Sequence, residues 1–180
     1  MFLRLINFCN RDYDSNFWWK IRNYYIDSPK SEFWKWRYWK LMYKNNAFIP
    51  IDTQFASKPI FPHGLHGIFI SSGAHLGHGC TVFHQVTIGS NTLQDSKNAG
   101  SPVVGDNVYI GAGAKIIGNV KIGNNVRIGA NCVVTKDIPD NSTVVLNLPN
   151  VILHEKPRNN SFISWGQYNA SYNIEIKYDN

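Results

Sequence analysis

Long apolar runs are missing from this sequence: none approaches the roughly 20 residues that a membrane-spanning helix needs. The opening MFLRLINFCN also lacks a sustained apolar region and a small-residue cleavage site, so we expect a cytoplasmic protein that is not exported. Cysteine is scarce, because Cys9, Cys80 and Cys132 are far apart and form no C-x-x-C motif. Neither a disulfide framework nor a structural zinc site is therefore expected, and a reducing compartment fits best.

The 180 residues are 43% hydrophobic and 17% charged, which is typical of one folded domain. Eighteen basic and twelve acidic residues give a net charge of +6, and nine of the basic residues fall in the first 50 positions. The excess charge is small and no recognition module is present, so we do not expect nucleic-acid binding.

Aliphatic residues recur at every sixth position in two runs. The first run is Ile70, Leu76, Val82 and Ile88, and the second is Val104, Ile110, Ile116, Ile122, Ile128 and Val134. A small or β-branched residue follows most of them four places later, and glycine follows directly at 77, 89, 105, 111, 123 and 129. A period of six fits neither a helix nor a simple amphipathic strand. It predicts an all-β solenoid of triangular coils of about 18 residues, with glycine at bends that need positive φ or close backbone approach.

The two runs are out of phase, so residues 91–102 must form a loop that leaves the solenoid, and a loop of this kind is more often functional than accidental. We expect three segments: an aromatic, basic helical segment over 1–50, the solenoid over 51–145, and a C-terminal tail over 146–180. The sequence predicts a helix over 31–46, much of it buried against the solenoid or a neighbouring subunit. The alternative is an aromatic and basic surface that meets a membrane interface or a glycan carrier.

Five of the six histidines, His63, His66, His75, His78 and His84, fall within 22 residues. They could supply a general base, a metal site or only stacked polar side chains. Only His66 and His84 are 18 residues apart, so only this pair would stack in successive coils, and no metal site is expected. One imidazole is enough to take a proton from an alcohol, which typically contributes about 10² to 10⁴ in rate.

A family resemblance rests on two stretches and the loop between them. The stretches are PHGLHGIFISSGAHLGHGCTVFHQVTIGSN and PVVGDNVYIGAGAKIIGNVKIGNNVRIGANCVVTKDIPDNS. In this order they resemble the serine acetyltransferase branch of the hexapeptide-repeat acyltransferases, in particular its relatives encoded with surface-polysaccharide enzymes. The resemblance implies a left-handed parallel β-helix, a homotrimer, and acetyl-CoA in the groove between adjacent subunits, with no metal required.

The resemblance also implies site residues. The catalytic histidine of the branch matches His63 best, and His66 competes with it because the segment here is one residue longer than in the serine enzymes. The acceptor side would be served by His84, through a hydrogen bond to the acceptor or cofactor, and by Asp52, which would orient the base. The cofactor contacts of the family map onto Gly89, Ser90, Ala112 and Ala130.

Several departures from the serine enzymes bear on the acceptor. Gly100-Ser101-Pro102 stands where those enzymes have R-H-P, Pro62 stands where they have aspartate, and their large helical N-terminal domain is missing. We therefore predict an acetyl-CoA-dependent O-acetyltransferase that acts on a sugar hydroxyl of a surface polysaccharide. The alternatives are a serine O-acetyltransferase and, in another class, a non-catalytic or metal-binding β-helix.

Overall fold

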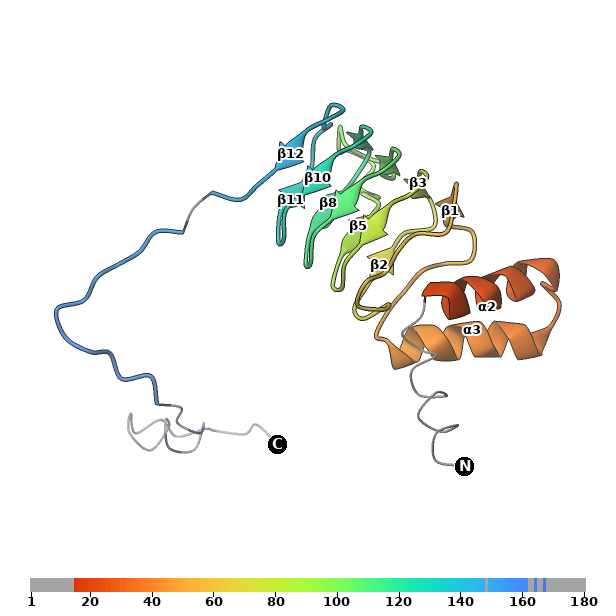
Figure 1. Ribbon diagram of the computed structural model, residues 1–180, viewed down its shortest axis with the longest axis horizontal. Coiled ribbons are helices and arrows are strands. Elements are labelled where there is room, and N and C mark those ends of the chain that lie inside the picture. Colours follow the sequence, from red (N-terminus) through yellow and green to blue (C-terminus); the bar gives the residue numbers. More distant parts are fainter. Residues whose placement is uncertain (1–14, 148, 162–163, 165–166, 168–180) are drawn as a thin grey trace. The chain divides into compact units, whose positions relative to one another are not determined.

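A computed structural model describes residues 15–147, 149–161, 164 and 167 of the chain (Figure 1). The chain divides into two units, Met1–Asn147 and Leu148–Asn180. In the described part of the first unit, two helices precede a solenoid. In the second unit, residues 149–161 form neither helix nor strand.

The helices α2 (Ser15–Asp27) and α3 (Glu32–Lys44) pack against each other at the N-terminal end of the solenoid (Figure 1). Helix α3 matches the helix expected over 31–46, and it has Glu32 in its first turn and Lys44 in its last, as the helix dipole favours. The expected burial is only partly right, because Tyr38, Leu41 and Met42 are the buried residues of α3. Its remaining aromatic side chains are partly or largely exposed.

Twelve short strands form the solenoid, and all their pairings are parallel. They are β1 (Gln54–Phe55), β2 (Phe69–Ile70), β3 (His75–Leu76), β4 (Thr81–Val82), β5 (Thr87–Gly89), β6 (Val103–Val104), β7 (Tyr109–Ile110), β8 (Lys115–Ile117), β9 (Lys121–Ile122), β10 (Arg127–Ile128), β11 (Val133–Val134) and β12 (Thr143–Val144). They make three four-stranded sheets in the orders β1-β3-β6-β9, β12-β10-β7-β4 and β11-β8-β5-β2. Each sheet is one face of a triangular prism, so the predicted all-β solenoid with a short helical N-terminal part is confirmed (Figure 1).

The core of the prism consists of the residues that the six-residue period singled out. All ten aliphatic positions from Ile70 to Val134 are buried, and so are the small residues between them, including Ala74, Cys80, Ala114 and Cys132. The stacked side chains form one continuous apolar cluster that also includes Trp18, Ile21 and Tyr38 of the helices. Burial of one repeated set of side chains explains why the strands can be only two or three residues long.

Glycine and asparagine have different roles at the bends. None of the six glycines that follow an aliphatic residue has positive φ, so of the two expected reasons only close backbone approach applies. A Cβ on Gly111, for example, would lie 2.7 Å from the amide nitrogen of Ala130. Left-handed backbone is instead adopted at Asn107, Asn125 and Asn141, whose side chains hydrogen-bond in a ladder from one coil to the next.

The spacing between paired strands shows where the coils depart from regularity. Paired residues are 18 apart where the solenoid is regular, as between Phe69 and Thr87, but 21 apart between the first and second coils, as between Gln54 and His75. Ile60 pairs with Thr81, so the coil is in place up to Ile60. The three extra residues therefore lie between Ile60 and the start of strand β2. The solenoid is therefore widened at one corner, over residues 61–68.

The second departure is the predicted loop, which raises the spacing to 28 between strands β5 and β8. The loop closes with an antiparallel bridge between Asn91 and Gly100. It does not simply extend away, because the Asn98 side chain donates to the carbonyl oxygens of Ile117 (3.3 Å) and Thr135 (3.4 Å) in the next two coils.

The helices are fixed to the first coil by polar and aromatic contacts. The buried Arg22 guanidinium donates to the carbonyl oxygens of Ile51 (3.0 Å) and Thr53 (2.8 Å), and the Tyr38 hydroxyl donates to that of Ile49 (2.7 Å). The Trp18 ring lies edge-on to Phe61, with 5.3 Å between ring centroids. These contacts connect the helices to the widened corner.

Two of the three cysteines and both described helices can be compared with the sequence. Cys80 and Cys132 are buried and free, whereas Cys9 lies outside the described residues. Among the described helices, none has the length and apolar character needed to cross a membrane.

Candidate active site

The widened corner of the first coil holds the first two histidines of the cluster. Phe61 and Leu65 are buried on either side of His63 and anchor this corner to the core. Gly64 and Gly67 both have positive φ, so the chain can turn sharply twice within five residues. The extra length lets the His63 side chain lie on the outside of the prism, where it is exposed.

His63 contacts His84 of the next coil. Their Nδ1 atoms are 2.9 Å apart, so one ring donates a proton and the other accepts it. Phe83 lies edge-on to the His63 ring, with 5.3 Å between ring centroids, and packs against it. The expectation that only His66 and His84 would stack is therefore wrong, because the three extra residues bring His63 over His84.

The backbone of His66 lies beside that of His84 in the next coil. The amide of Gln85, the residue after His84, donates to the carbonyl oxygen of His66 (2.8 Å). The side chains of His66 and His84 both line a cleft of about 490 Å³, together with Gln85, Thr87 and Lys115. His84 thus contacts His63 on one side and borders the cleft on the other.

The cleft has a cationic lining. None of the described residues that line it carries a carboxylate, whereas Lys44 and Lys115 bring ammonium groups. The Lys115 Nζ is held by the carbonyl oxygens of Gln85 (2.7 Å) and Gly113 (2.9 Å), so its position is fixed. Such a lining favours a ligand with an anionic group.

Two of the predicted cofactor residues follow the histidines along the same corner. Gly113 donates to the carbonyl oxygen of His84 (3.0 Å), and Asn131 donates to that of Ala112 (2.9 Å), so Ala112 and Ala130 lie in the next two coils. Ala112 is half-buried and Ala130 is exposed. Because neither side chain is larger than a methyl group, an extended chain can approach the backbone here, and these residues fit a bound pantetheine arm.

The other two predicted cofactor residues, Gly89 and Ser90, lie at the C-terminal end of strand β5. The Ser90 hydroxyl is hydrogen-bonded to Ser71 (2.9 Å) and Ser101 (2.7 Å), and Gly89 accepts from the amide of Gly118 (2.9 Å). Ser101 therefore has a structural contact at the position where the serine enzymes have histidine. Within one chain, Gly89 and Ser90 are not brought together with His63.

Asp52, His75 and His78 lie apart from this cluster. Asp52 is exposed in the turn before β1, and in the described part of the chain no hydrogen bond or ion pair joins it to His63. His75 and His78 are exposed on the second coil. Among the described residues, no group of three histidine, cysteine or acidic side chains could hold a metal ion.

Lys115 and Phe83 were missed by the reasoning from sequence. Lys115 sits on β8 in register with Thr87, so its outward position could have been read from the repeat. Its contribution to a cleft shared with His66 could not, because that depends on the widened corner.

Comparisons with known proteins show what the solenoid is similar to. Residues 101–136 match the family described as bacterial transferase hexapeptide (six repeats). A serine acetyltransferase of Staphylococcus xylosus is 38% identical over 106 residues, which is 59% of this chain and 47% of that protein.

Two solved structures are similar in fold. The Neisseria gonorrhoeae serine acetyltransferase in complex with serine has a TM-score of 0.60 at 26% identity, covering 75% of this chain and 54% of that one. A serine acetyltransferase in complex with CoA has a TM-score of 0.58 at 25% identity, covering 72% of this chain and 51% of that one. The chain thus spans about half the length of these proteins.

These relatives overturn the predicted acceptor. They are serine acetyltransferases, so the preference for a surface-polysaccharide sugar is wrong and the alternative is favoured. The sugar acceptor was preferred because short motifs of the serine enzymes are missing. The likeness over most of the solenoid is the stronger signal. The predicted resemblance itself is confirmed: the chain carries a β-helix that is similar to the serine acetyltransferases and that matches the hexapeptide-repeat transferases over residues 101–136.

Proposed function

We propose that this chain transfers an acetyl group from acetyl-CoA to the hydroxyl of L-serine. The observation that carries the proposal is the contact between His63 and His84 beside a cleft lined by cationic side chains. The serine acetyltransferase relatives, one of them solved with serine and another with CoA, support the choice of both substrates. We assign the activity to residues 51–145, with residues 1–50 and 146–180 as flanking segments.

His63 acts as the general base in this proposal. If its Nδ1–H donates to the Nδ1 of His84, its Nε2 carries the lone pair that takes the proton of the acceptor hydroxyl. His84 then orients the base, the role first considered for Asp52, which has no contact with His63 in the described structure. His66 is the competing base, because it lines the cleft directly.

The acceptor would lie in the cleft with its carboxylate toward Lys115. An amino acid brings both a carboxylate and a hydroxyl, and the absence of acidic side chains among the described lining residues favours the carboxylate. Fixing both groups would hold the hydroxyl near the histidines, which lowers the entropic part of the barrier.

Ala112 and Ala130 would hold the donor along the histidine corner. When bound, acetyl-CoA would supply an activated acetyl thioester, so that the serine oxygen gains the acetyl group and the CoA thiol leaves with the proton. Gly89 and Ser90 would contact the donor from the adjacent corner of a neighbouring chain, because one chain does not place them beside His63.

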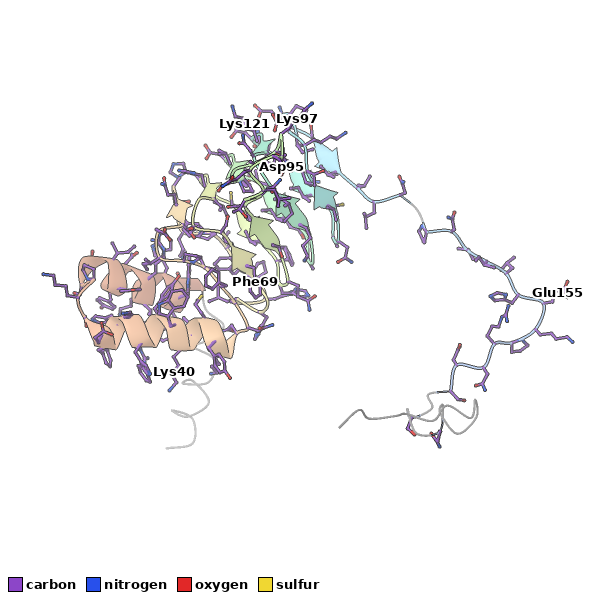
Figure 2. The ribbon with its side chains drawn as sticks, turned by 180° about the vertical axis from the view of Figure 1, so that it is seen from behind. Lys40, Phe69, Asp95, Lys97, Lys121 and Glu155 are labelled. Carbon is purple, nitrogen blue, oxygen red and sulfur yellow. The ribbon has the colours of Figure 1, made fainter. Side chains whose placement is uncertain are left out.

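A homotrimer with its active sites at the subunit boundaries belongs to this proposal. The outer face of the sheet β11-β8-β5-β2 exposes Phe69, which is labelled in Figure 2, and Val133. These are apolar side chains that an interface would cover. Sedimentation equilibrium would give three times the chain mass of 20.5 kDa, and a monomeric enzyme with full activity would refute the shared site.

The activity is tested by adding acetyl-CoA to the full chain with and without L-serine. The proposal predicts serine-dependent thiol release and a product with the mass of O-acetylserine. If serine gives no release while another hydroxyl compound does, the acceptor is wrong. If no hydroxyl compound gives release, the enzymatic proposal fails as a whole.

A further inference from the structure

Helix α3 exposes large aromatic side chains on the face opposite to the one that it buries. Phe33 is 57% exposed, Trp36 is 54% exposed and Tyr43 is 89% exposed. With 3.6 residues per turn, these three residues and Lys40 fall within an arc of about 80° around the helix. We call Phe33, Trp36, Lys40 and Tyr43 the aromatic-lysine stripe.

The stripe lies on the solvent side of the helix pair. The buried residues of α3, which are Tyr38, Leu41 and Met42, face the other way and belong to the core. Figure 2 shows Lys40 pointing away from both α2 and the solenoid. Exposed aromatic side chains that line up on one helix face are unusual on a protein surface without a partner.

The charge around the stripe is mainly positive. Lys40 lies over the Trp36 ring, with its Nζ 4.6 Å from the ring centroid. Residues 15–44 contain seven basic and two acidic residues, and one of the acidic residues, Glu32, is paired with Lys35. A partner that covers the stripe must therefore accept aromatic rings and carry negative charge.

We propose that the aromatic-lysine stripe binds the surface of an anionic lipid bilayer. Tryptophan and tyrosine are suited to the headgroup region because their rings are apolar and carry one polar atom. Lysine can lay its apolar stem along the interface and keep its ammonium group at the anionic headgroups. A 13-residue helix is about 20 Å long, so α3 would lie in the plane of the interface.

Two other occupants fit the stripe less well. A second copy related by twofold symmetry would place the same basic stripe against itself, and the like charges would repel. A neutral glycan could stack on the aromatic rings but would leave the basic surroundings without a partner. Neither occupant is needed for the acetyl transfer proposed above, and the membrane proposal does not depend on that activity.

The test uses flotation of the full chain with vesicles of phosphatidylcholine alone or with about 30% phosphatidylserine. The matched variants are Lys40→Glu and Lys121→Glu, which make the same charge change at two exposed lysines, the second on β9 at the far end of the solenoid (Figure 2). We expect binding to the anionic vesicles only, reduced at least about fivefold by Lys40→Glu and unchanged by Lys121→Glu. The double variant Phe33→Ser/Trp36→Ser should lose binding while it keeps the circular dichroism of the native chain.

Several results would overturn the proposal. These are no binding of the native chain to anionic vesicles, equal binding to neutral vesicles, or equal loss in the two lysine variants. A change in oligomeric state on Phe33→Ser/Trp36→Ser, with vesicle binding intact, would assign the stripe to contacts between copies. Retention on a glycan matrix without vesicle binding would assign it to a glycan.

Discussion

His63 and His84 place their Nδ1 atoms 2.9 Å apart although they are 21 residues apart in sequence. Two protonated rings cannot share this contact, because each nitrogen would then present a proton to the other. The contact therefore requires at least one neutral imidazole. If His63 is the donor, its Nε2 is left free to act as a base.

The tautomer of His63 can be tested apart from activity. We expect the ¹⁵N chemical shifts of the native chain to show a protonated Nδ1 and an unprotonated Nε2 on His63. In His84→Ala the acceptor is lost, so the proton should move to Nε2, and the rate should fall about tenfold, as for the loss of one hydrogen bond. His84→Gln should retain both the tautomer and most of the rate, since its amide oxygen can accept the same proton.

A native His63 that carries its proton on Nε2 would contradict this assignment. His75→Ala is the control, because His75 is exposed on the second coil and has no part in the pair. Its spectrum should match that of the native chain at the His63 ring nitrogens.

The attachment of the helices to the solenoid depends on Arg22. Replacing it with methionine removes two hydrogen bonds from a buried guanidinium and leaves the carbonyl oxygens of Ile51 and Thr53 without that donor. The free energy of unfolding should fall by about 1.5 to 3 kcal/mol, measured by urea denaturation at fixed protein concentration. Lys30→Met, at an exposed position, should lower the free energy of unfolding by less than about 0.5 kcal/mol. Equal losses of stability in the two variants would mean that Arg22 does not attach the helices to the solenoid.

The stacked core can be tested with two neighbouring valines of β6. Val104 is 2% exposed and Val103 is 44% exposed, so alanine removes the same atoms from opposite sides of one strand. We expect Val104→Ala to lower the free energy of unfolding by about 2 kcal/mol, because it leaves a cavity. Val103→Ala should change it by less than about 0.5 kcal/mol, and a reversed order would contradict the inward register.

Alkaline pH should destabilise the fold through two buried groups. Burial raises the pKa of the Cys80 thiol and that of the Tyr38 hydroxyl, so both keep their protons in the folded chain at pH values where the unfolded chain releases them. Stability should therefore fall as the pH rises above about 8.5, where an unfolded thiol titrates, and more steeply above about 10. The variant Cys80→Ala/Tyr38→Phe should show a smaller slope in urea unfolding between these values, and an unchanged slope would exclude both groups as the cause.

Much of the fold could be predicted because the six-residue repeat is directly visible in the sequence. The ten aliphatic residues of the six-residue repeat are all buried, and the break in the repeat after Ile88 marks the loop. Helix α3 could be placed because Ser28-Pro29 and Glu32 signal its start. Helix α2 was not placed, since its aromatic residues show no clear period and its stability comes from packing of Trp18 and Ile21 against the first coil.

The site could be predicted only in part for a related reason. The histidines and small residues are visible in the sequence, but the contact between His63 and His84 depends on three extra residues at one corner. That insertion becomes visible only when the pairing of β1 with β3 is known. Likewise, the position of Gly89 and Ser90 at another corner depends on where each strand ends, and the six-residue pattern does not specify this.

The most direct test of the proposed activity compares His63→Gln with His66→Gln in serine-dependent thiol release from acetyl-CoA. The account predicts that His63→Gln lowers kcat by about 10² to 10⁴, while His66→Gln, which keeps a polar side chain at the cleft, changes it by less than about tenfold. Both variants must sediment as the native chain does. A large loss in His66→Gln with nearly native activity in His63→Gln would show that the base has been assigned to the wrong histidine.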